Sequence, residues 1–181
     1  MNTQDVHLVF TASPRTFSRL IRWFTNSPTS HVMVEYPSDL WGGRWIAQAS
    51  VGGVHKVPAN KARHYVVADV ECVFDVRNAL HSIAQCIGNP YDYEGLAGYT
   101  WSKILKKYFR RKMSRPLHDP NALFCSEMVA TMLIAAKLPG TEDWTPEFIA
   151  PVDILRYCLQ HPELFKVMVA ESSVEKFLMT I

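Results

Sequence analysis

Leu123-Phe124-Cys125-Ser126-Glu127-Met128-Val129 determines much of what we expect of this chain, because it places a cysteine where a helix should begin. Ser126 and Glu127 favour the first helical turn, and a mainly apolar run follows as far as Leu138. The positive end of a helix dipole lowers the pKa of a thiol. We therefore expect Cys125 to be a nucleophile, although most free cysteines are small buried apolar residues.

A histidine that could activate this thiol lies far upstream, in the strand-like stretch Ser30-His31-Val32-Met33-Val34-Glu35. A thiol needs a neighbouring base to become a thiolate at neutral pH, although a lone strand histidine is more often a satisfied core residue. Two groups could orient the imidazole. Gln48, on the next expected strand, has an amide oxygen that can accept from a ring N–H. Glu35 shares a face with His31 but lies ~13 Å away along an extended strand.

The remaining pattern predicts strands in the first half of the chain and helices in the second. Strands are expected at 6–11, 31–36, 45–50, 54–57 and 65–70, and helices after 13–15 and at 76–87, 95–109, 125–138 and 154–159. Asp153 is a candidate N-cap, and 163–181 mixes strand and helix signals. Residues 1–181 are thus predicted to form a single α+β domain, with a small antiparallel sheet packed on the Cys125 helix.

Composition excludes several classes of function. The chain is 48% hydrophobic and 20% charged, as in ordinary globular proteins, and its net charge of +2 is too small to favour nucleic acid as a partner. Its four cysteines form no CxxC pair and no Cys/His spacing suited to zinc, so we expect free thiols, no metal and no cofactor.

The segment Met1–Thr11 lacks a signal-peptide core, and no apolar run approaches the ~18–20 residues of a membrane span. We expect cytoplasmic synthesis and no transmembrane segment. A virus-encoded protein, or delivery to the envelope by other means, remains open.

Four short segments occur in a telling order: Ser30-His31-Val32, Ala47-Gln48-Ala49 before Gly52-Gly53-Val54, Pro90-Tyr91-Asp92-Tyr93, and Phe124-Cys125-Ser126-Glu127. Together they resemble the circularly permuted NlpC-type papain-like cysteine hydrolases. The branch most similar is the YiiX/YebB-like group, with lecithin retinol acyltransferase a more distant cousin. The resemblance extends to about residue 153, so it covers most of the chain.

The resemblance implies a permuted papain-like domain with three catalytic positions. Cys125 would be the nucleophile, His31 the base and Gln48 the residue that orients the imidazole. The family often has glutamate where Gln48 stands. A glutamine can orient an imidazole but cannot stabilise an imidazolium as a carboxylate does, so Glu35 remains the alternative third member.

Residues near the expected cleft could bind substrate. The tyrosine segment of the family tends to lie there, so Tyr91, ahead of Tyr93, is assigned to substrate binding together with Ser126. The cations of the stretch 103–115 could hold an anionic polymer or a lipid headgroup, or could simply form a solvated helix face. They are Lys103, Lys106, Lys107, Arg110, Arg111, Lys112 and Arg115.

The function predicted from these residues is a thiol-dependent amidase or peptidase that acts through an acyl-enzyme. By resemblance, peptidoglycan stem peptides or related small peptides are the expected substrates. Two alternatives remain: a lipid acyltransferase or thioesterase of the same fold, and a catalytically weak binding or structural module.

Overall fold

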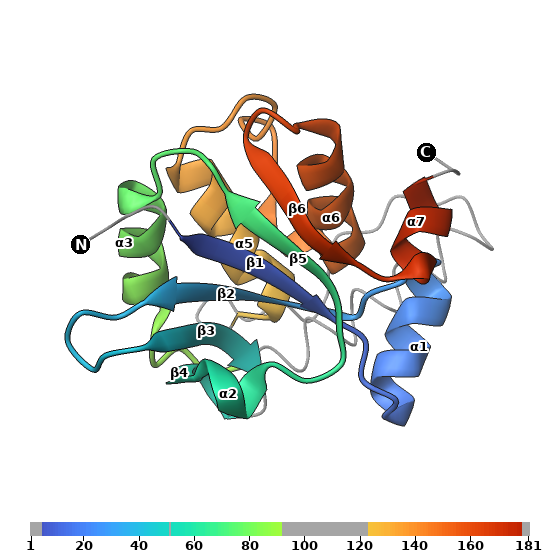
Figure 1. The fold of residues 1–181 in the computed structure, drawn as a ribbon, viewed down its shortest axis with the longest axis horizontal. Coiled ribbons are helices and arrows are strands. Elements are labelled where there is room, and N and C mark those ends of the chain that lie inside the picture. Colours follow the sequence, from blue (N-terminus) through green and yellow to red (C-terminus); the bar gives the residue numbers. More distant parts are fainter. Residues whose placement is uncertain (1–4, 51, 92–122, 179–181) are drawn as a thin grey trace.

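The computed structural model of the protein describes residues 5–50, 52–91 and 123–178, and Figure 1 shows a sheet with helices packed against it. The strands are β1 (Val6–Thr11), β2 (His31–Pro37), β3 (Arg44–Ser50), β4 (Gly53–Pro58), β5 (Val66–Cys72) and β6 (Phe165–Ala170). The helices are α1 (Thr16–Thr25), α2 (Ala59–Ala62), α3 (Arg77–Cys86), α5 (Cys125–Ala135), α6 (Pro151–Gln160) and α7 (Ser172–Leu178), with a 3-10 turn η1 (Pro146–Phe148).

The six strands form one antiparallel sheet in the order β4-β3-β2-β1-β5-β6. Strand β1 lies between β2 and β5, and all six of its residues are buried, as its continuous apolar run predicts. The expected α+β class is confirmed, and the sheet is larger than the small one expected because the chain returns late to add β6 beside β5.

Helices α3, α5 and α6 cover one face of the sheet (Figure 1) and supply the main core. Alternating residues of the central strands, such as Leu8 and Val34, meet Met128 and Leu133 of α5 there. Fully burying side chains of this size contributes roughly 1.5–3 kcal/mol each. A smaller cluster on the other face contains Val9, Met33, Ile46 and Ala59. Helix α5 is therefore held by burial, and the sheet fixes where its first residue lies.

A closed ring of six ionisable side chains occupies the face of the sheet away from α5. Glu35, which is 1% exposed, accepts from Nε of Arg44 at one carboxylate oxygen and from Nη1 of Arg63 at the other, the latter at 2.6 Å. Arg44 also donates to Asp5 (2.5 Å), and Arg63 also donates to Asp69. His7 closes the ring between the two aspartates. Full pairing is what allows buried charges to persist.

The geometry of the ring requires His7 to be an imidazolium. Its Nδ1 lies 2.7 Å from Oδ1 of Asp69 and its Nε2 lies 2.9 Å from Oδ1 of Asp5. Carboxylates only accept hydrogen bonds, so both ring nitrogens must carry a proton. The hydrogen bond to Asp69 raises the pKa of His7 most, burial opposes it, and the bond to Asp5 adds to the rise. With His7 charged, the ring holds three positive and three negative groups.

We predict that the stability contributed by His7 falls as pH rises. Its folded pKa lies above the ordinary value of 6.5, so the contribution is fully present below 6.5 and is lost as pH passes the raised value. The free energy of unfolding of the wild type should decline as pH rises from about 6.5 through the raised pKa, by at most about 1.4 kcal/mol per pH unit from this one proton. His7→Gln should flatten that decline, and an unchanged slope in the variant would contradict the assignment.

The start of β4 is fastened to the segment after α3. Gly53 has a φ of +102°, and a Cβ there would overlap the carbonyl oxygen of Asn89. That oxygen accepts from the N–H of Val54 at 2.8 Å, and the N–H of Gly88 donates to the carbonyl of Val54 at 2.8 Å. The same segment continues to Pro90, whose carbonyl accepts from the N–H of residue 123 at 3.0 Å. One strap thus joins β4 to the approach to α5.

Neighbouring glycines offer a matched test of this fastening. Gly52 also has a positive φ, +97°, but a Cβ there would meet nothing within 4 Å. Gly52→Ala should cost only the backbone strain, on the order of 1 kcal/mol. Gly53→Ala should cost clearly more because it adds the overlap with Asn89. Equal losses of unfolding free energy in chemical denaturation would show that the close approach is unimportant.

The predicted N-cap of the helix after residue 150 is wrong, and one predicted helix is not covered by the structure. Asp153 is not the N-cap of α6: the cap is Ala150, and the Asp153 carboxylate accepts from the Ala150 N–H at 2.9 Å. The helix begins earlier because Pro151 suits its first position. The helix predicted at 95–109 lies outside the described residues.

Candidate functional site

Cys125 and His31 meet where helix α5 begins beside the start of β2. Each is the first residue of its element, and the two side chains are close enough to shift each other's pKa. Cys125 is only 6% exposed and His31 is half-buried. The structure thus brings together the nucleophile and the base that the sequence predicts, although they are separated by more than half of the chain.

Local contacts fix the first turn of α5. Phe124 is extended (φ −106°, ψ 169°), and its N–H donates to the Glu127 carboxylate at 3.5 Å. The Ser126 hydroxyl donates to the carbonyl of Ile149 at 2.7 Å. Ser126 and Glu127 are both buried, so neither can swing away without leaving a polar group unpaired. These contacts fix the backbone from which the Cys125 side chain projects.

The surroundings of Cys125 favour the thiolate. Burial acts to raise the pKa of the thiol, but the charge of His31 and the His31 hydrogen bond outweigh it. The backbone N–H groups of Val32 and Ser126 add hydrogen bonds to the sulfur, and the pKa lies below its ordinary value. Burial likewise acts to lower the pKa of His31, yet Cys125 and Gln48 together raise it. Both shifts are in the direction that favours a thiolate–imidazolium pair.

The pKa values of the other three cysteines are shifted in the direction opposite to that of Cys125. Burial raises the pKa of Cys72, Cys86 and Cys158, and nearby negative charge adds to each rise. All four cysteines are free. Cys125 is therefore the one of the four thiols whose pKa is lowered, while the other three are buried core groups.

Gln48 is the group that contacts the far side of the imidazole. Its Oε1 lies 3.2 Å from Nε2 of His31, so Nε2 donates and the remaining nitrogen, Nδ1, is left for Cys125. Gln48 reaches this position because β3 pairs with β2. Glu35, the alternative third member, is bound instead by Arg44 and Arg63 in the ring described above. The structure brings Gln48, and not Glu35, to His31.

The residues assigned to substrate binding are placed differently from one another. Tyr91 is partly buried, packs against the main core and forms a parallel bridge with Leu123, two residues before Cys125. The Ser126 hydroxyl is occupied by the carbonyl of Ile149, so this residue offers its backbone N–H rather than its side chain. Tyr93 and the basic stretch 103–115 lie outside the described residues.

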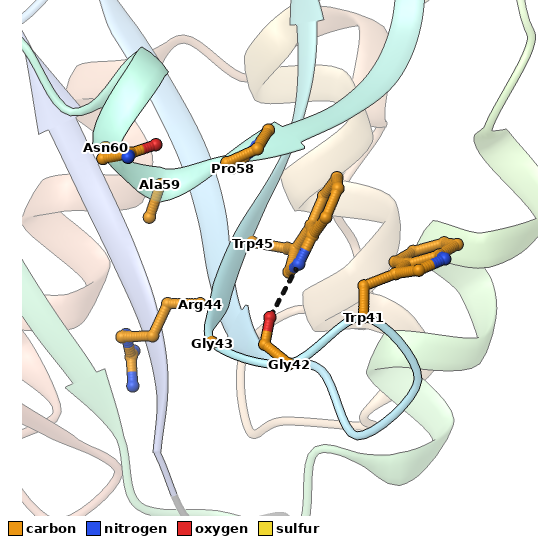
Figure 2. A pocket seen from close by; sticks show the side chains of 8 residues that line it. All are labelled: Trp41, Gly42, Gly43, Arg44, Trp45, Pro58, Ala59 and Asn60. Carbon is orange, nitrogen blue, oxygen red and sulfur yellow. Dashed lines mark hydrogen bonds between the residues drawn. The ribbon is translucent and has the colours of Figure 1, made fainter.

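A shallow pocket of about 500 Å³ lies at the opposite end of the β2–β3 hairpin (Figure 2). Its lining contains no nucleophile and no general base, and Arg44 is already paired with Glu35 and Asp5. The lining residues are Trp41, Gly42, Gly43, Arg44, Trp45, Pro58, Ala59 and Asn60. Gln48 lies four positions after Arg44 on β3, or ~13 Å along the strand, so this pocket is separate from the Cys125 site.

Sequence reasoning missed His55, which continues the chain of contacts. Its Nε2 lies 3.4 Å from Nε2 of Gln48, and its Nδ1 lies 2.9 Å from the carbonyl oxygen of Gly53. The signal was available in the predicted hairpin, because Gln48 and His55 are direct partners in the β3–β4 register. A search for metal-ligand spacing alone does not find a residue of this kind.

Within the part of the chain that the structure describes, no group of three or more His, Cys, Asp or Glu side chains is arranged to hold a metal ion. Over those same residues, no helix has both the length and the apolar character needed to cross a bilayer.

Comparison with known proteins finds likeness at the level of fold. No protein-family model matches the chain, and no curated protein matches it. A solved structure does: the crystal structure of the metalloprotein YiiX (DUF1105) from Escherichia coli O157:H7. The two are 15% identical, with a TM-score of 0.51, over 96% of this chain and 92% of YiiX. The chain thus has a YiiX-like α+β fold over nearly its whole length.

Selective alkylation tests the electrostatics of the site. With limiting iodoacetamide near neutral pH, Cys125 should be modified well before the other three cysteines, because its pKa alone is lowered. Peptide mass mapping reads out the modified residue. His31→Ala should slow the reaction of Cys125 by about tenfold or more, one pKa unit being a factor of ten. Indiscriminate labelling, or no effect of His31→Ala, would contradict the pair.

Proposed function

We propose that the protein is a thiol-dependent amidase or peptidase with a permuted papain-like site. The observation that carries this proposal is the contact chain Cys125–His31–Gln48, which supplies a nucleophile, a base and an orienting group in one place. The YiiX-like fold supports it, because this is the branch that the ordered sequence motifs resemble.

The reaction would proceed through an acyl-enzyme. The Cys125 thiolate attacks the amide carbon, a C–S bond forms, and the carbonyl electrons move to the oxygen. The unpaired backbone N–H of Cys125 at the helix start helps hold that oxyanion. The C–N bond then breaks, and the His31 imidazolium gives its proton to the leaving amine. His31 next takes a proton from water, and the resulting hydroxide attacks the thioester carbon. The C–S bond breaks, which releases the acid and regenerates the thiolate.

The substrate class rests on the resemblance. Peptidoglycan stem peptides, or related small peptides with γ-glutamyl or lysine-containing linkages, are the proposed substrates. Tyr91 would contribute to the wall of the binding region, and its bridge with Leu123, two residues before Cys125, supports this assignment.

Removal of the nucleophile tests the proposal. Cys125→Ala should lower hydrolysis of a synthetic stem peptide by at least about a thousandfold, since loss of a nucleophile removes the covalent route. The melting temperature should change little. Cys86→Ala, at a cysteine whose pKa is raised, is the matched control and should retain turnover.

Mass spectrometry of cleaved stem peptides would measure turnover in each variant. Turnover that survives Cys125→Ala would refute the mechanism. A wild type that leaves every amide intact but deacylates a thioester or transfers an acyl chain to an amine would favour the acyltransferase or thioesterase alternative instead.

A further inference from the structure

We infer that His55 is a positioning residue for the Cys125–His31 pair, acting through the orientation of the Gln48 amide. This inference rests on the proposed function and extends it to a residue outside the three catalytic positions. The relevant contacts run in series from the carbonyl of Gly53 through His55 and Gln48 to His31.

The series is anchored at a group that can only accept. The carbonyl oxygen of Gly53 lies 2.9 Å from Nδ1 of His55, so Nδ1 must carry the proton. A neutral imidazole has one N–H, and Nε2 of His55 is therefore an acceptor. The anchor is held in place by its neighbours: Val54 donates its N–H to the Asn89 carbonyl at 2.8 Å, and Gly53 has a positive φ in a position that leaves no room for a Cβ.

An acceptor at His55 determines which way the Gln48 amide points. The amide NH₂ donates to Nε2 of His55 at 3.4 Å, so the amide oxygen faces His31. That oxygen accepts from Nε2–H of His31 at 3.2 Å. Nδ1 of His31 is then the nitrogen that takes the thiol proton. Each hydrogen bond in the series thus fixes whether the next group donates or accepts. In this way a neutral amide can orient the imidazole as a carboxylate would.

Without His55, the Gln48 NH₂ group loses its hydrogen-bond acceptor, and the amide is free to rotate by 180°. A rotated Gln48 would present NH₂ to the Nε2–H of an imidazolium, donor against donor. His31 would then hold its second proton less well, and less of Cys125 would be thiolate. A glutamate at position 48 would be insensitive to this, because both of its oxygens accept.

A double-mutant cycle follows from that difference. We compare His55→Phe in the wild-type background and in Gln48→Glu, measuring the pH dependence of Cys125 alkylation by iodoacetamide in the full chain. With Gln48 present, His55→Phe should lower the rate near neutral pH about tenfold, equivalent to about one pKa unit. In the Gln48→Glu background, the same change should cost less than about twofold, since the carboxylate needs no orienting.

The outcomes are separable. Equal losses in both backgrounds would mean that His55 acts only on the packing of β4, and no loss with Gln48 present would likewise overturn the inference. His64→Phe, at an exposed histidine just after α2, is the matched control and should leave the profile unchanged. If wild-type Cys125 reacts like an ordinary thiol and His31→Ala changes nothing, the proposed function fails. An activated pair that is indifferent to His55 removes only this inference.

Nuclear magnetic resonance reads the same claim in the unaltered protein, so it does not depend on the folding of a variant. Long-range proton–nitrogen correlation spectra distinguish the two neutral imidazole tautomers. His55 should show the Nδ1–H form near neutral pH, and His31 should show a protonated Nε2. A neutral His55 with its proton on Nε2 would contradict the inference, because that nitrogen could not accept from Gln48.

Discussion

The mutual effect of Cys125 and His31, which shift each other's pKa in opposite directions, is the interaction on which the site of this protein depends. Neither residue would be unusual alone, since buried cysteines are normally inert and strand histidines normally structural. The two residues meet because α5 begins beside the start of β2, and the backbone of Val32 and Ser126 also acts to lower the pKa of the Cys125 thiol. A thiolate in a site that is nearly closed to solvent needs every one of these partners.

The rest of the fold can be understood as the support of that meeting point. Burial of α5 against the sheet fixes the helix, and the Glu127 and Ser126 contacts fix its first turn. The segment 88–91 holds the start of β4 on one side and runs beside Leu123 on the other. On the opposite face of the sheet, the ionic ring ties β1, β2, β3 and β5 together. The reactive pair therefore lies between elements that are each held by independent contacts.

Much of this could be predicted from sequence because the signals are local. Short apolar and β-branched runs between turn signals located β1 to β5 within a residue or two, and the sequence around Cys125 marked the start of α5. Gln48 was also predictable, since a hairpin register brings neighbouring strands together. The features that the sequence did not predict depend on contacts between residues far apart in the chain. Strand β6 joins the sheet after a long excursion, and its stretch Phe165–Ala170 carries mixed signals because most of it is exposed.

Glu35 shows the same limit at the level of a side chain. It shares a strand face with His31, which made it a reasonable alternative third member, but its partners Arg44 and Arg63 come from β3 and from the end of α2. No short-range sequence pattern predicts the ionic ring, because its six side chains come from positions far apart in the chain. His55 was missed for a different reason: its role depends on which nitrogen holds a proton, and only the contact with the Gly53 carbonyl settles that.

The most direct test of the account is an ultraviolet titration of the thiolate, taken as the difference between the wild type and Cys125→Ser across pH. We expect a thiolate signal that belongs to Cys125 and titrates below the ~8.5 of a free thiol. That signal should move back towards the ordinary value in His31→Ala, because the imidazolium that stabilises it is gone. A difference signal that titrates at or above the ordinary value, with or without His31, would contradict the thiolate–imidazolium pair and the function built on it.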